Sequence, residues 1–119
     1  MGEKILRRRL ELGLTQKEIA KQLGINDQTV SRWETGESNP NIKHYPFVIS
    51  FLDYYPFEID DTFGGKIKRY RFINGMSRKK LAQLFKISSK LIQEIEENKS
   101  LPSINLGASL AQLFTKGIL

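Results

Sequence analysis

The chain has 119 residues, no cysteine and one histidine, which excludes disulfide scaffolds, cysteine-rich zinc sites and thiol nucleophiles. Its formal net charge is +6 and its pI is about 9.7, a balance typical of proteins whose partner carries phosphates. No stretch has the character of a membrane span or a signal peptide, so we expect a cytoplasmic protein without a membrane partner.

The charge is distributed unevenly along the chain. Residues 1–62 hold eight basic and ten acidic side chains, whereas residues 63–119 hold eleven and three. Four acids of the first half lie in its last ten residues: Asp53, Glu58, Asp60 and Asp61. We therefore assign these acidic residues to a connector. The second half of the chain is strongly basic.

Two short helices are predicted in the first quarter of the chain. An apolar face that includes Ile5 indicates the first helix, and Gly13 ends it at a position suited to a left-handed cap. Thr15 and Glu18 form a capping box, in which each side chain accepts from the other residue's backbone N–H. A second helix therefore begins there, and Gly24 stops it.

A third helix is predicted from Asn26, a good N-cap, to Gly36. Val30 and Trp33 are its inward residues, and we expect Trp33 to be a core residue rather than a stacking platform. A fourth helix near residues 46–52 adds apolar side chains to the core. No segment alternates with a period of two, so the predicted fold is all-α.

The predicted connector, residues 55–65, is rich in aromatic side chains and contains Ile59. Leaving these side chains in water would be costly, so the segment does not resemble a flexible Gly/Ser tether. We expect it to pack on one or both halves and to hold them at a preferred angle.

The sequence repeats itself at an offset of 62 residues without a gap. The identical pairs include Ile5 with Ile67, Arg9 with Arg71, Gly13 with Gly75, Ala20 with Ala82, Glu34 with Glu96 and Pro40 with Pro102. Self-similarity at a fixed period indicates one unit used twice, and matched Gly and Pro breakers do not follow from an apolar rhythm. We predict two tandem small helical bundles of four to five short helices each, in residues 1–54 and 66–119.

The second copy departs from the first at its helix ends. Ser77 and Ser88 keep the two N-caps, and Asn98 stands where the first copy has its last glycine. Lys80 replaces the acid of the capping box, and Lys86 replaces the glycine of the turn. If Lys86 keeps a positive φ, the non-glycine residue costs on the order of 1 kcal/mol.

Two short helices joined by a tight turn between Leu23 and Asn26 are typical of a helix-turn-helix. Residues 5–40 resemble the phage repressor/Cro family, also called the xenobiotic-response-element family. The resemblance is carried by Arg9, residues 13–16, 18–20, 23–24 and 29–34, Gly36 and Pro40. It implies a lambda-repressor-like fold and a transcriptional regulator that binds double-stranded DNA as a dimer. Residues 67–102 resemble the family more faintly.

The third helix, about residues 26–35, presents polar residues opposite Val30 and Trp33. The candidate base readers are Asp27, Gln28, Ser31 and Arg32. Gln28 can pair bidentately with adenine and Arg32 with guanine, each worth ~1–3 kcal/mol of discrimination. The alternative is a solvated polar face, and Asp27 can instead simply favour the helix N-terminus.

Predicted phosphate contacts lie in both copies. They are Gln16, Lys17 and Asn26 in the first copy and Arg78, Lys79 and Lys90 in the second. The resemblance implies that Gln16 bridges to phosphate from the start of the second helix; plain solvated side chains are the alternative. The outward positions of the second copy become Ser89, Lys90, Gln93 and Glu94, so guanine readout is lost. That copy either grips the DNA backbone or is a degenerate packing surface.

The resemblance also implies a structural ion pair between Arg9 and Glu34, which the repeat keeps as Arg71 and Glu96. An enzyme is not expected, because the sequence lacks a Gly-rich phosphate loop and a nucleophile paired with a base. No cofactor or metal is expected, and His44 is assigned a structural or solvent role. The alternative function is an antitoxin-like or adaptor protein that uses the same fold for protein–protein interaction.

Overall fold

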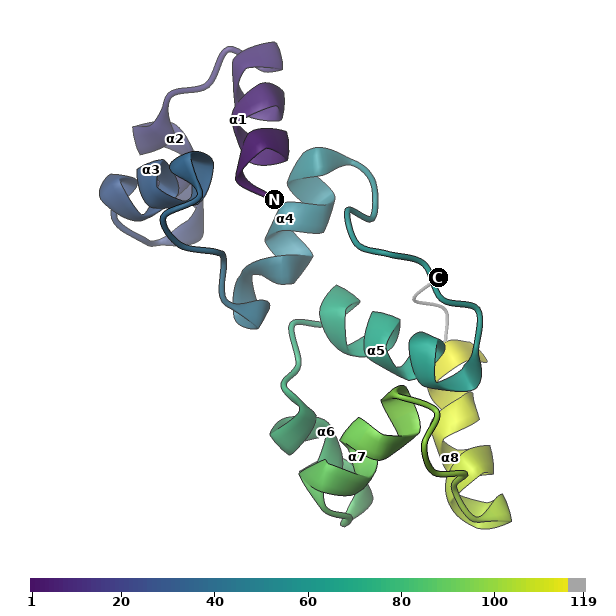
Figure 1. The fold of residues 1–119 in the computed structure, drawn as a ribbon. Helices are drawn as coiled ribbons and strands as arrows, with labels where there is room; N and C mark the ends of the chain where they lie inside the picture. The colour runs from purple at the N-terminus through teal and green to yellow at the C-terminus, as the bar shows by residue number, and fades with distance from the viewer. Residues whose placement is uncertain (116–119) are drawn as a thin grey trace. The chain divides into compact units, whose positions relative to one another are not determined.

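The computed structural model describes residues 1–115 of the chain (Figure 1). Within these residues it contains eight α-helices, one short 3₁₀ helix and no strand, so the all-α prediction is confirmed. No helix among them is both long enough and apolar enough to cross a membrane. The chain divides into two compact units, Met1–Phe57 and Glu58–Leu119, here called the first and second unit.

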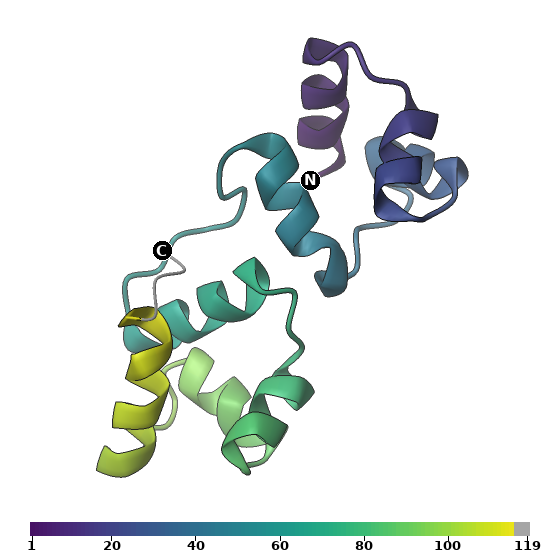
Figure 2. The same cartoon turned by 180° about the vertical axis from the view of Figure 1, so that it is seen from behind.

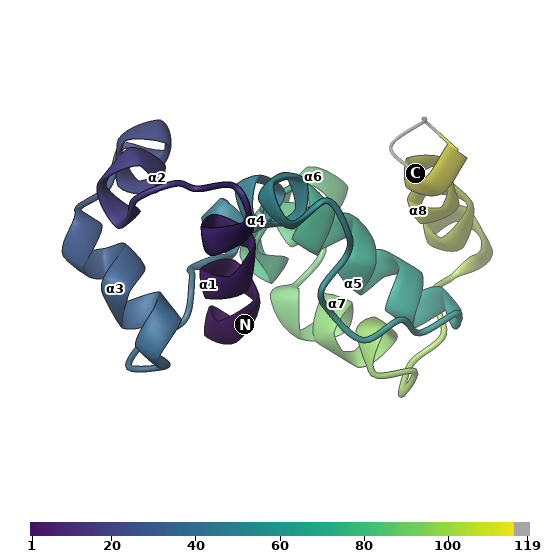
Figure 3. The same cartoon turned by 90° about the horizontal axis from the view of Figure 1, so that it is seen from above.

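The first unit is a bundle of short helices. Its elements are α1 (Gly2–Glu11), α2 (Gln16–Leu23), α3 (Asp27–Thr35), the 3₁₀ helix η1 (Ile42–His44) and α4 (Tyr45–Leu52). Helix α1 packs against α3 and α4, and α2 packs against α3. Seen from above, α2 and α3 lie beside each other at one end of this unit (Figure 3).

Two adjoining apolar clusters hold the first unit together. One consists of Ile5, Trp33, Val48 and Leu52, and the other of Ile19, Ala20 and Val30. Half-buried side chains from α2, the following turn and α4 contact both clusters. Helix α3 contributes to each cluster, so its orientation is fixed by burial on two sides.

The helix ends of the first unit follow the predicted chemistry. The Thr15 hydroxyl accepts from the N–H of Glu18 at 3.1 Å, and the Thr15 N–H donates to the Glu18 carboxylate at 3.0 Å, which confirms the capping box. Gly24 has a φ of 68° and lies in the left-handed region, as a tight turn before α3 requires. The Asn26 side chain then caps α3 by accepting from the N–H of Gln28 at 2.7 Å.

As far as residue 115, the second unit is built from four helices (Figure 2). They are α5 (Phe63–Ile73), α6 (Arg78–Phe85), α7 (Ser89–Glu96) and α8 (Ile104–Thr115). Helix α5 packs against α7 and α8, and α6 packs against α7. The buried core consists of Ile67, Leu81, Ala82, Ile92, Ile95 and Leu110.

The predicted helix ends of the second unit are present as well. Ser77 and Ser88 cap α6 and α7 by accepting from backbone N–H groups at 3.1 Å. Lys86 has a φ of 56° and Asn98 a φ of 58°, so both occupy the left-handed region in which the first unit uses glycine. Helix α7 ends at Glu96, one residue before the position equivalent to the end of α3.

A close helix approach recurs in both units at the repeat offset. A Cβ atom on Gly2 would lie 1.8 Å from the carbonyl oxygen of Trp33, and one on Gly64 would lie 2.3 Å from that of Ile95. Both distances are too short for atoms that are not bonded to each other. Glycine is therefore required at both positions for the first helix to approach the third.

The connector packs partly on the first unit. The Phe57 ring lies 4.7 Å from the Tyr45 ring and 5.3 Å from the Tyr55 ring, centroid to centroid. Lys4 Nζ also donates to the Pro56 carbonyl at 3.2 Å. The expected packing is thus found for these aromatics, whereas the preferred angle between the units stays a prediction.

The rest of the connector differs from the expectation. Ile59 is 62% exposed instead of buried. Helix α5 begins at Phe63, inside the predicted connector, because the Thr62 hydroxyl caps it by accepting from the Gly65 N–H at 3.0 Å.

Candidate nucleic-acid interface

The outer face of α3 carries the predicted base-reading residues. Val30 and Trp33 are 0% and 3% exposed, which turns the opposite side of the helix to solvent. Asp27, Gln28 and Arg32 are exposed there, and Ser31 is half-buried. The structure therefore gives a short helix with an amide and a guanidinium accessible on one face.

The start of α2 lies against α3 through a contact that the sequence reasoning did not anticipate. Gln16 Nε2 donates to Glu34 Oε1 at 2.9 Å, and the Gln16 side chain is half-buried. A glutamine amide has two N–H donors, so the one used for Glu34 leaves the second to be satisfied elsewhere. Gln16 is thus held at the surface between the two helices.

A surface hollow of about 480 Å³ lies beside the α2–α3 turn. It is lined by Lys17, Ala20, Lys21, Ile25, Asn26 and Asp27. The hollow brings Lys17 and Asn26, both predicted to contact phosphate, next to Asp27. The Asn26 side-chain oxygen caps α3, so the Asn26 amide N–H groups and the exposed lysines are the donors that an anion could meet at this place.

The first unit also contains a partly buried ion pair. Arg9 donates to both carboxylate oxygens of Glu34, at 2.6 and 3.0 Å, and to the Leu14 carbonyl at 3.0 Å. The Glu34 side chain is only 4% exposed. The hydrogen bond with Glu34 raises the pKa of Arg9 above its usual range, although burial acts in the opposite direction. The predicted pair is present, and it ties α1 to α3.

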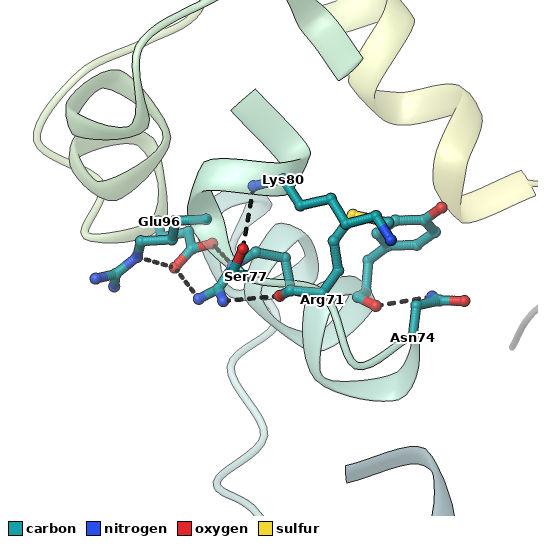
Figure 4. A network of polar contacts seen from close by, with 8 residues as sticks. Arg71, Asn74, Ser77, Lys80 and Glu96 are labelled. Carbon is teal, nitrogen blue, oxygen red and sulfur yellow. Dashed lines mark hydrogen bonds and ion pairs between the residues drawn. The ribbon is translucent and has the colours of Figure 1, made fainter. Parts of the chain in front are cut away.

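The second unit contains the equivalent network (Figure 4). Arg71 donates to both carboxylate oxygens of Glu96, the longer bond measuring 2.8 Å, and to the Met76 carbonyl at 3.2 Å. Arg78 adds a third cationic contact, with Nε 3.1 Å from Glu96 Oε1. Arg78 occupies the position that Gln16 has in the first unit. Its side chain is 37% exposed, so only this exposed part could make the predicted phosphate contact.

The outer face of α7 differs from that of α3 in where its charged residues lie. Ser89, Lys90 and Gln93 are exposed, whereas Glu94 is half-buried. The Ser100 hydroxyl donates to the Glu94 carboxylate at 3.3 Å. A carboxylate therefore stands where the first unit presents Arg32.

Comparison with known proteins identifies the first unit. Residues 5–59 match the family described as helix-turn-helix. These residues are a helix-turn-helix domain. The domain is of a DNA-binding type, and α2 and α3 are its two characteristic helices.

Two curated relatives contain a similar segment. The chain is 32% identical over 101 residues to the type II methyltransferase M1.ScrFI of Lactococcus lactis subsp. cremoris, a match covering 78% of this chain and 25% of that protein. It is 37% identical over 73 residues to the type II methyltransferase M.SsoII of Shigella sonnei, covering 59% and 18%. The chain thus spans a quarter or less of these relatives. No solved structure matches it significantly.

Within the helix-turn-helix domain, His44 has a packing role. Its ring lies 5.6 Å from the Trp33 ring, centroid to centroid. Burial, followed by the nearby charge of Lys43, lowers the pKa of His44 below its ordinary value. No three His, Cys, Asp or Glu side chains gather as metal ligands within residues 1–115.

Proposed function

We propose that the helix-turn-helix domain binds a specific sequence of double-stranded DNA with α3 in the major groove, and that it regulates transcription. The proposal depends on one observation: α3 buries one face in the core and exposes polar side chains on the opposite face. Val30 and Trp33 are buried, and Gln28 and Arg32 are exposed on the opposite face. Gln28 is suited to adenine and Arg32 to guanine, because each can form two hydrogen bonds with that base.

The contacts with the DNA backbone would come from the start of α2. Lys17 is exposed there, Gln16 is held at the surface by Glu34, and Asn26 lies beside them. Phosphate contacts of this kind fix the position of a helix on the duplex without reading its sequence. Such a division of roles between α2 and α3 fits the helix-turn-helix type of docking.

We further propose that this chain supplies DNA binding rather than catalysis. The two relatives are methyltransferases by name, but the chain spans only 25% and 18% of their lengths. The matched family is a DNA-binding domain. Methyl transfer is accordingly not assigned to the residues of this chain.

Selection of random duplexes with the full chain, followed by Arg32→Ala, tests the proposal. We expect a defined site, and we expect the variant to lose discrimination at one base pair by ~1–3 kcal/mol, or about 5- to 150-fold. Affinity for unrelated duplexes should be retained in large part. Arg7→Ala, which removes the same charge from an exposed position on α1, is the matched control and should leave the preference unchanged. Equal loss on all sequences would contradict the role of Arg32.

The alternative, an adaptor that binds another protein through the same fold, predicts a different response to salt. Binding driven by phosphates weakens steeply as salt rises, with a slope near −0.9 for each phosphate neutralised. An apolar protein interface does not show this dependence. A salt titration of the selected duplex therefore separates the two functions.

A further inference from the structure

The second unit carries a positive charge that its own acids do not balance. It holds eleven basic and six acidic side chains, and three of the acids, Glu58, Asp60 and Asp61, precede α5. Glu96 is buried between Arg71 and Arg78, Glu97 pairs with Lys99 at 3.3 Å, and Glu94 accepts from Ser100. The exposed lysines elsewhere on this unit therefore face solvent in a region of excess positive charge.

Two of these lysines are adjacent on α6. Lys79 and Lys80 are both exposed, and they follow Arg78 in the first turn of the helix. In the first unit the position of Lys80 is held by Glu18, whose carboxylate completes the capping box. In the second unit Ser77 caps the helix alone.

This arrangement is unfavourable for the isolated helix. The N-terminal end of a helix carries a partial positive charge, and a cation there typically opposes it by ~0.3–1 kcal/mol. Three consecutive basic residues add mutual repulsion. The acid that lines the hollow of the first unit, Asp27, is also absent here, because Ser89 takes its place. At the repeat offset, Glu18 and Asp27 are thus replaced by a lysine and a serine, which favours an anionic partner.

The neighbouring face of α7 is unsuited to reading bases. Glu94 stands in the position of Arg32, and Gln93 Nε2 lies 3.5 Å from the carboxylate of Glu97. Carboxylates on this face are repelled by phosphates and can accept from few groups in a groove. The basic start of α6 and the Glu94 carboxylate on α7, which stands in the position of Arg32, therefore favour contact with the DNA backbone over contact with base edges.

We propose that the second unit grips the phosphate backbone of duplex DNA through Lys79 and Lys80 and raises affinity without adding sequence preference. This inference rests on the proposed function of the first unit, since it assumes the same duplex as partner. The chemistry recognised is a row of phosphates, to which lysine ammonium groups bind as point charges.

The test is the salt dependence of binding by the full chain to the selected duplex and to a shuffled one. Lys79→Ala/Lys80→Ala should reduce the slope of log K against log salt by about 1 to 2, because each lost phosphate contact contributes ~0.9. The affinity ratio between the two duplexes should stay the same. Both side chains are exposed, so we expect the fold to be kept, and circular dichroism checks this.

The matched control is Lys66→Ala/Lys68→Ala, which removes the same charge from exposed positions on α5. We expect a smaller change in slope from this pair. Equal changes in both variants would overturn the proposal in favour of a general charge effect, and no change in the α6 variant would overturn it directly. A changed affinity ratio would show that the second unit reads bases.

Arg32→Ala, measured in the same series, separates this inference from the function on which it rests. If Arg32→Ala alters the preference while the α6 variant binds like the wild type, only the backbone grip is wrong. If the chain binds no duplex at all, both proposals are wrong.

Discussion

At the scale of single residues, His44 links the packing of the first unit to pH. It is the only histidine of the chain, and its ring lies against Trp33, the buried aromatic at the centre of the first core. Burial and the charge of Lys43 lower its pKa from the ordinary value of 6.5. The folded chain therefore holds this proton less tightly than the unfolded chain.

Acidification below about pH 6.5 should lower the free energy of unfolding of the first unit. In that range the unfolded state binds more protons at His44 than the folded state does, so stability falls as pH falls and is fully present above the unfolded pKa. The loss should be modest, and thermal unfolding followed by Trp33 fluorescence measures it. Asp60 and Glu97 do not contribute in this pH range, because hydrogen bonds lower the pKa of each carboxylate below its ordinary, already acidic value.

The control for this pH effect is His44→Phe, which keeps an aromatic ring beside Trp33 and cannot be protonated. Its melting temperature should be less sensitive to pH between about 6.5 and 5.5 than that of the wild type. An identical decrease in both proteins would assign the effect to other groups.

The two Arg–Glu ion pairs were predicted from the sequence, but the additional donor to each glutamate was not. The Arg9–Glu34 and Arg71–Glu96 pairs followed from a family resemblance and from the repeat, and both are present. That Gln16 and Arg78 also donate to these carboxylates was not predicted. The contact depends on how α2 is placed against α3, and α6 against α7, which local patterns do not specify.

At the scale of helices, α1 approaches α3, the helix with the proposed base-reading residues, closely enough to require a glycine. Gly2 lies where any side chain would meet the Trp33 carbonyl. Glycines that end helices are predictable from the sequence, because they follow an apolar helical pattern. The role of Gly2 and Gly64 was not predicted, because it comes from a contact with a residue 31 positions away. Their match at the repeat offset was the available signal.

Gly2→Ala should destabilise the first unit by about 1–3 kcal/mol, the usual cost of forcing an extra carbon into a packed site. The added Cβ would lie 1.8 Å from backbone oxygen, so α1 must move away from α3. Glu3→Ala, at the next and exposed position of α1, is the control and should change stability little. Urea unfolding of both variants measures the difference, and an equally stable Gly2→Ala protein would show that α1 shifts freely.

The connector shows why the ends of helices were harder to predict from the sequence than the presence of the helices. Its aromatic residues were correctly expected to avoid water, since Tyr55 and Phe57 contact other rings. The start of α5 was placed too late, because Thr62 caps a helix whose first turn contains two glycines. Glycine is a poor helix former, so local propensity favoured a loop where tertiary packing forms a helix.

At the scale of the whole molecule, each unit has a core of its own. The buried clusters of the first unit contain no residue of the second, and the reverse also holds among the described residues. Trp33 is the only tryptophan of the chain and lies in the first core. Its fluorescence therefore reports on the first unit, whereas far-ultraviolet circular dichroism reports on the helices of both.

Arg9→Ala and Arg71→Ala should accordingly act on different transitions. Each removes the main partner of a buried glutamate, a change that costs ~3–5 kcal/mol, and each kcal/mol lowers the melting temperature of so small a unit by roughly 4–8 °C. Arg9→Ala should lower the transition seen by Trp33 fluorescence while leaving the sequence preference of residual binding unchanged. Arg71→Ala should lower the melting temperature of only the part of the circular dichroism transition that comes from the second unit. This decrease should be smaller than that caused by Arg9→Ala, because Arg78 still contacts Glu96. If Arg71→Ala shifted the Trp33 transition equally, the two units would unfold as one.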